Sequence, residues 1–91
     1  METRTYTAEL EAGTRVRIYR PDYQSFHEKP DPFAGLTGTV VRVIFPGDIM
    51  YEGWGMPNGT GEVKYQIELD KEYPATKTKN FLFSGRELAR L

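Results

Sequence analysis

The chain has 91 residues, enough for one small domain and too few for a catalytic domain joined to a second one. Cysteine is absent, which excludes disulfides, thiolate metal sites and cysteine nucleophiles; a reducing, cytoplasmic location is therefore predicted. The formal net charge is −1, with six basic and six acidic side chains in residues 1–45 and six and seven in residues 46–91. A nucleic-acid-binding domain of this size normally has a basic excess, so nucleic acid is a disfavoured partner.

The N-terminal residues are polar and weakly patterned. Residues 1–6 contain no apolar segment of the kind found in signal peptides, and no apolar run approaches the ~20 residues of a membrane helix. Membrane insertion is therefore not expected. Residues 1–10 are predicted to form an arm, either flexible or packed, and residues 11–91 a single domain.

Two stretches rich in β-branched residues predict the first strands. Residues 14–20 form the first, which Pro21 ends because proline has no N–H to donate to a strand ladder. Residues 36–45 form the second, in which Gly38 suggests a bend or a bulge. Alternation places Val16 and Ile18 on one face of the first strand, and Arg15, Arg17 and Tyr19 on the other. In the second strand it places Thr39, Val41 and Val43 on one face, and Val40, Arg42 and Ile44 on the other.

Two segments predict long loops. Residues 21–35 contain three prolines, and their aromatic side chains are expected to be partly packed. Residues 46–62 contain five glycines and two prolines, which predicts a loop or an irregular hairpin. Within this second segment Asn58-Gly59 is a strong signal for a tight turn.

The C-terminal third predicts the remaining strands. Residues 63–70 alternate cleanly, with inward side chains at Val63, Tyr65, Ile67 and Leu69. A charged turn over residues 71–79 and a short strand over 80–83 follow. Ser84 and Glu87 then match a capping box, which predicts a 3₁₀ turn before a last strand over 88–91. The whole pattern predicts an all-β fold, a five-stranded half-open barrel of SH3-like type.

Residues suited to catalysis are few. His27 is the only histidine, and carboxylates without further ligands would suit only Mg²⁺ or Ca²⁺. Asp22 with Glu28, or Asp48 with Glu52, could act as acid and base, but a barrel this small has no lumen and nothing in the sequence places either pair in a pocket. We therefore predict no enzyme activity, no catalytic residue and no cofactor or metal site.

The best candidate for binding is the apolar part of residues 46–62. It consists of Ile49, Met50, Tyr51, Trp54 and Met56. Exposed aromatic and methionine side chains concentrate at protein interfaces, so Met50, Tyr51 and Trp54 are predicted anchors for a protein partner, with Met56 beside them. The alternative is a satellite core folded over one end of the barrel.

Arginines of the first two strands form a second candidate surface. These are Arg15, Arg17, Arg20 and Arg42. They are expected either to pair with Glu68, Asp70 or Glu72 on a solvated face, or to contact an acidic partner or an RNA backbone. Arg17 and Arg42 are predicted to lie at the rim of the interface and to orient the partner.

Four segments resemble the SH3-like barrels of the electron-transport accessory group. This group includes the photosystem I reaction-centre subunit IV, the variable chain of ferredoxin–thioredoxin reductase, and the barrel of the nitrile hydratase β subunit. The segments are residues 13–21 (GTRVRIYRP), 35–41 (GLTGTVV), 65–69 (YQIEL) and 78–88 (TKNFLFSGREL). Residues 46–62 are longer and richer in Gly, Met and Trp than the corresponding part of the photosystem subunit.

The resemblance implies a non-catalytic accessory subunit that binds and stabilises a larger enzyme or electron-transfer complex. It carries over no catalytic residues. Two alternatives remain open. The spacing of Gly13, Val16 and Ile18 followed by Gly35, Gly38 and Val40 is also similar to KOW-type modules that bind RNA or ribosomes, and a nitrile hydratase β-type subunit would require a metal-bearing partner chain.

Overall fold

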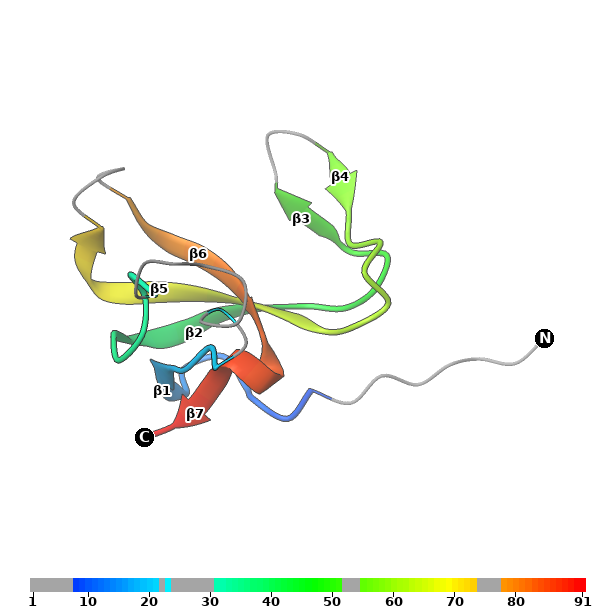
Figure 1. Ribbon diagram of the computed structural model, residues 1–91. Helices are drawn as coiled ribbons and strands as arrows, with labels where there is room; N and C mark the ends of the chain where they lie inside the picture. The colour runs from blue at the N-terminus through cyan, green and yellow to red at the C-terminus, as the bar shows by residue number, and fades with distance from the viewer. Residues whose placement is uncertain (1–7, 22, 24–30, 52–54, 74–77) are drawn as a thin grey trace.

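The computed structural model describes residues 8–21, 23, 31–51, 55–73 and 78–91, and their regular structure is almost entirely β. The elements are β1 (Arg15–Ile18), β2 (Thr37–Ile44), β3 (Ile49–Tyr51), β4 (Met56–Pro57), β5 (Lys64–Tyr73), β6 (Thr78–Ser84), the 3₁₀ helix η1 (Gly85–Glu87) and β7 (Leu88–Arg90). Five strands form an antiparallel sheet of order β6-β5-β2-β1-β7, and β3 pairs with β4 in a separate hairpin (Figure 1). The prediction of a small all-β domain is confirmed. Neither sheet closes on itself within the described residues.

Most of the predicted element boundaries agree with the structure. The 3₁₀ turn is present after Ser84, whose N–H donates to the Glu87 carboxylate at 2.9 Å. Residues 46–62 do contain an irregular hairpin. β5 is longer than predicted, because it continues to Tyr73 through the start of the expected turn, with a register shift beyond Glu68.

The core lies on one face of the five-stranded sheet. It consists of Leu10, Val16, Ile18, Val40, Tyr65, Ile67, Leu69 and Phe83. The inward faces predicted for the first strand and for most of β5 are confirmed, while Val63 is only partly buried. Leu10 falls within the predicted arm, and its burial in this cluster is worth about 1.5–3 kcal/mol. The Glu9 N–H supports this position by donating to the Tyr65 hydroxyl at 3.1 Å.

A bulge in β2 changes the predicted alternation of that strand. The register with β5 shifts between Val40 and Arg42, so two residues oppose one there. Val40 and Val43 consequently both pack on the core, and Val41 is exposed. The prediction that Val40 and Val43 face opposite ways is therefore wrong. Ile44 lies opposite Lys64 and is fully buried, yet it is not part of the main core cluster.

An ion pair fixes the end of the first long loop. The Arg20 guanidinium donates to both carboxylate oxygens of Asp31, whose side chain is 2% exposed. The same guanidinium lies 4.8 Å from the centroid of the Tyr23 ring and 5.0 Å from that of Phe33. Phe33 in turn packs edge-on against Phe81, with centroids 4.8 Å apart. The predicted partial packing of the loop aromatics is confirmed for Tyr23 and Phe33.

Candidate functional site: the β3–β4 hairpin

Residues 45–62, here called the excursion, leave the five-stranded sheet after β2 and rejoin it at β5. Figure 1 shows β3 and β4 standing apart from the sheet at the end of two extended connections. Ile49 pairs with Pro57 and Tyr51 with Met56, with an irregularity between the two pairs. The excursion begins with a tight turn in which the Asp48 carboxylate accepts from the Phe45 N–H at 3.0 Å. A short hairpin of this kind has little stability of its own, so its position depends on its base.

Asn58 is the centre of that base. Its side-chain nitrogen donates to the carbonyl oxygens of Ile44 at 3.3 Å and Glu62 at 2.8 Å. Its side-chain oxygen accepts from the Thr60 N–H at 3.1 Å and from the Thr60 hydroxyl at 2.6 Å. The residue is 2% exposed, and every polar atom of its amide has a partner. Its backbone also bonds the opposite leg, through Gly47 at 2.9 Å and Asp48 at 2.7 Å. Asn58 therefore joins both legs of the excursion to the end of β2.

Arg42 supports the hairpin from the sheet side. Its guanidinium donates to the carbonyl oxygens of Ile49 and Met50 in β3. The side chain is thus directed along the hairpin, and its donors are used within the chain. The predicted rim residue is brought to the predicted anchor segment, but it acts there as a support.

A polar cluster lies where the excursion returns to the sheet. Lys64 and Arg86 donate to different oxygens of the Glu62 carboxylate, at 2.9 and 3.0 Å. The buried Ser84 hydroxyl donates to Glu62 at 3.0 Å and accepts from Lys64 at 2.9 Å. The hydrogen bond from Lys64, assisted by Ser84 and by the positive charge of Arg86, lowers the pKa of Glu62 below its ordinary value. The cluster holds the last residues of the excursion against the start of η1.

The predicted anchor residues have different exposures. Met56 is 52% exposed and Ile49 is 38% exposed, whereas Met50 is half-buried. Tyr51 belongs to β3 through its backbone pairing with Met56. Trp54, the strongest anchor in the prediction, lies outside the described residues. Complete burial of Ile44 beneath the excursion's attachment point also gives partial support to the alternative of a satellite core.

The predicted basic face is largely paired internally. Arg15 forms a two-pronged ion pair with Asp70, at 2.6 and 2.7 Å, and Thr37 also donates to Asp70. The Arg15 hydrogen bonds hold the pKa of the Asp70 carboxyl well below its usual range. Arg20 is paired with Asp31. Arg17 is exposed on β1, and no hydrogen bond or ion pair joins it to another described residue.

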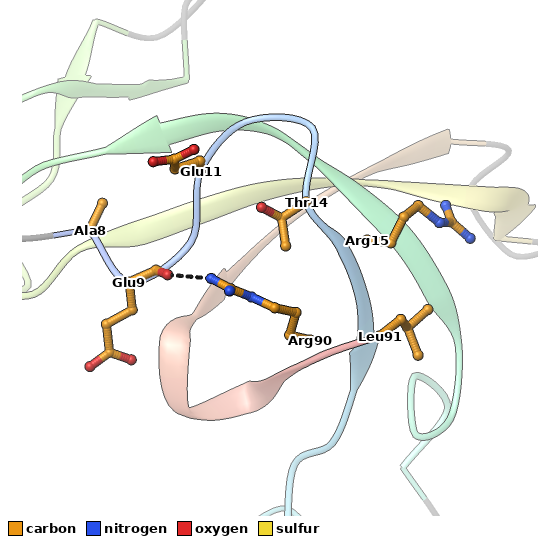
Figure 2. A pocket seen from close by; sticks show the side chains of 7 residues that line it. All are labelled: Ala8, Glu9, Glu11, Thr14, Arg15, Arg90 and Leu91. Carbon is orange, nitrogen blue, oxygen red and sulfur yellow. Dashed lines mark hydrogen bonds between the residues drawn. The ribbon is translucent and has the colours of Figure 1, made fainter.

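A shallow hollow of about 440 Å³ lies beside the N-terminal segment, between β1 and β7 (Figure 2). Its lining contains two carboxylates, Glu9 and Glu11, and two guanidinium groups, Arg15 and Arg90. Arg90 donates to the Glu9 carbonyl oxygen at 2.9 Å, and Arg15 is held by Asp70. Because both cations already have partners, the hollow offers no preformed site for an anionic ligand.

Comparison of the chain with protein families, with curated proteins and with solved structures gives no match. Within the described ranges, no helix is long and apolar enough to cross a membrane. The same residues contain no group of three or more His, Cys, Asp or Glu side chains arranged to hold a metal ion.

Sequence reasoning missed the structural role of Asn58. The Asn-Gly pair predicts a tight hairpin turn, but the hairpin turns between Tyr51 and Met56, and Asn58 follows β4. The one signal in the sequence is the placement of an amide residue next to Pro57, after which a strand cannot easily continue. Neither the two carbonyl acceptors nor their distance can be read from this signal.

Proposed function

We propose that this chain is a non-catalytic accessory domain, an SH3-like half-open barrel that docks onto a larger protein through its β3–β4 hairpin. The observation that carries the proposal is an exposed apolar hairpin on a fixed base. Met56 and Ile49 are exposed, while Asn58 and Arg42 bond the base and one strand of the hairpin to the sheet. A binding element already held in place loses less conformational entropy when it binds.

The chemistry of the hairpin favours contact through side chains. Methionine is flexible and polarisable, so Met56 can adapt to an apolar groove on a partner. Pro57 in β4 has no N–H, which disfavours addition of a further strand at that edge of the hairpin. The expected partner surface is therefore an apolar groove that accepts Met56 and Ile49.

The arrangement of arginines supports a protein partner in preference to RNA. Arg15, Arg20 and Arg42 use their donors on groups of this chain, which reduces what is left for phosphates. Arg17 is exposed and remains the proposed orienting charge. The assignment to electron-transfer complexes rests on the sequence resemblance alone.

The test is partner binding by matched surface variants. The chain is used to capture its partner from nuclease-treated extract of its source cells, and the partner is then purified for affinity measurements. Met56→Lys is expected to weaken binding about tenfold or more, because a charge would enter an apolar groove. Leu91→Lys is the control, since Leu91 is equally exposed (57%) but lies at the end of β7.

Equal binding by wild type and Met56→Lys would refute docking through the hairpin. Capture that disappears after nuclease treatment and falls steeply with salt would instead support the KOW-like alternative. A partner that carries a metal site of its own would support the nitrile hydratase-type alternative.

A further inference from the structure

The Asn58-Gly59 pair is the one sequence signal that neither the hairpin turn nor the proposed docking surface uses. Asparagine followed by glycine is also the pair most prone to intramolecular deamidation, and asparagine is among the thermolabile residues. In the fold this amide is buried and bonded on both of its polar atoms. We propose that Asn58 is a deamidation site that the folded base of the excursion protects, and that its conversion to aspartate opens this base irreversibly.

The reaction needs only water as a co-reactant. The Gly59 backbone nitrogen loses its proton and bonds to the side-chain carbonyl carbon of Asn58, which forms a tetrahedral centre. The bond from that carbon to the side-chain nitrogen then breaks, and the nitrogen leaves as ammonia after gaining a proton. Water hydrolyses the resulting five-membered succinimide ring to aspartate or isoaspartate. The net change is one water consumed and one ammonia released.

The local structure leaves the attacking nitrogen uncrowded. Gly59 is exposed, and a Cβ atom built on it would meet no heavy atom within 4 Å. Its backbone φ lies outside the left-handed region, so an alanine could replace it without strain. The limit on the reaction therefore lies on the side of the Asn58 amide.

Hydrogen bonds hold that amide away from reaction. Attack requires the amide plane to turn toward the Gly59 nitrogen, which would break the bonds to the carbonyl oxygens of Ile44 and Glu62. Those two oxygens accept from the very nitrogen that must leave. With the side chain 2% exposed, water also has little access to the ring that would form. Conversion must therefore wait for local opening of the excursion.

The product does not fit the site that the amide leaves. An aspartate at position 58 keeps an oxygen for the Thr60 donors, but its second oxygen faces two carbonyl oxygens in place of a donor. Burying a carboxylate without a donor is strongly unfavourable. Isoaspartate also lengthens the backbone by one carbon. Either product is expected to leave the two legs of the excursion detached from Ile44.

The test follows deamidation by peptide mass spectrometry in mildly alkaline buffer, with the full chain folded or unfolded in urea. Asn58 is expected to convert at least about tenfold more slowly in the folded chain. Gly59→Ala is the matched control: it keeps the Asn58 contacts and should suppress conversion in urea by crowding the attacking nitrogen. Asn80, which precedes the bulky Phe81, serves as an internal reference within the same chain.

A second measurement uses the deamidated wild-type protein, separated by its extra negative charge. Its urea midpoint should fall, and the backbone amides of Gly47 and Asn58 should exchange hydrogen faster than before. Equal conversion rates in folded and unfolded chain would overturn the protection by the fold. An unchanged midpoint with unchanged exchange would overturn the opening of the base.

Discussion

Replacing Gly38 by alanine tests the closest backbone approach in the sheet. Gly38 lies in β2 between Val16 of β1 and Leu69 of β5. A Cβ atom at this position would lie 2.5 Å from the Glu68 carbonyl oxygen and 2.8 Å from the Ile67 Cγ2 atom. The first neighbour is backbone within a paired strand, so it cannot rotate away as a side chain could.

The cost follows from this geometry. Relieving the contact requires β2 and β5 to separate locally, which weakens about two ladder hydrogen bonds at ~1 kcal/mol each. Overpacking against the fully buried Ile67 adds about 1–2 kcal/mol. The expected loss in the free energy of unfolding is therefore about 3–4 kcal/mol. For a domain of this size that corresponds to a fall in Tm of about 12–30 °C.

Urea and thermal unfolding, followed by circular dichroism, measure the effect. Gly59→Ala is the matched control, because its new methyl group meets open space. It should change the free energy of unfolding by no more than about 0.5 kcal/mol. A Gly38→Ala variant as stable as Gly59→Ala would refute the close approach of β2 and β5.

Three further perturbations have expected outcomes of their own. Asp31→Asn leaves the Arg20 charge without its carboxylate and should destabilise the fold by about 2–4 kcal/mol, measured by urea unfolding; no loss would contradict a structural ion pair. Arg42→Ala should speed hydrogen exchange in β3 while lowering global stability by only about 1 kcal/mol; Arg17→Ala, the control, should change neither. Because the pKa of Glu62 is lowered in the folded chain, its contribution to stability is complete above its ordinary pKa and is lost as the pH falls through the folded value. Glu62→Gln should therefore show a smaller loss of stability in acid, and an acid profile identical to wild type would contradict the Lys64 contact.

The register of the first strand and the inward face of β5 can be predicted because both depend on local alternation. Val16 and Ile18 are buried as expected, and so are Tyr65, Ile67 and Leu69. The alternation fails in β2 because one bulge reverses the side-chain direction after Val40. The sequence signals irregularity at Gly38, but the bulge falls two residues later, where the strand is uniformly β-branched.

The candidate site is located correctly as a segment but not as an arrangement. Glycine, proline and methionine content is enough to single out residues 46–62. It cannot show that Arg42 bonds the hairpin backbone, nor that Asp70 takes up Arg15 across β2. These pairings join residues on different elements, so they depend on the order of the strands.

By itself the sequence determined the all-β class, the position of most strands and the 3₁₀ turn after Ser84. These features follow from side-chain alternation, proline and glycine placement and a capping pattern spanning four residues, all of which act between near neighbours. Only the tertiary structure decided what Gly38 and Asn58 are for. Their roles come from the Glu68 carbonyl in one case and the Ile44 carbonyl in the other, groups that folding brings close from at least fourteen residues away along the chain.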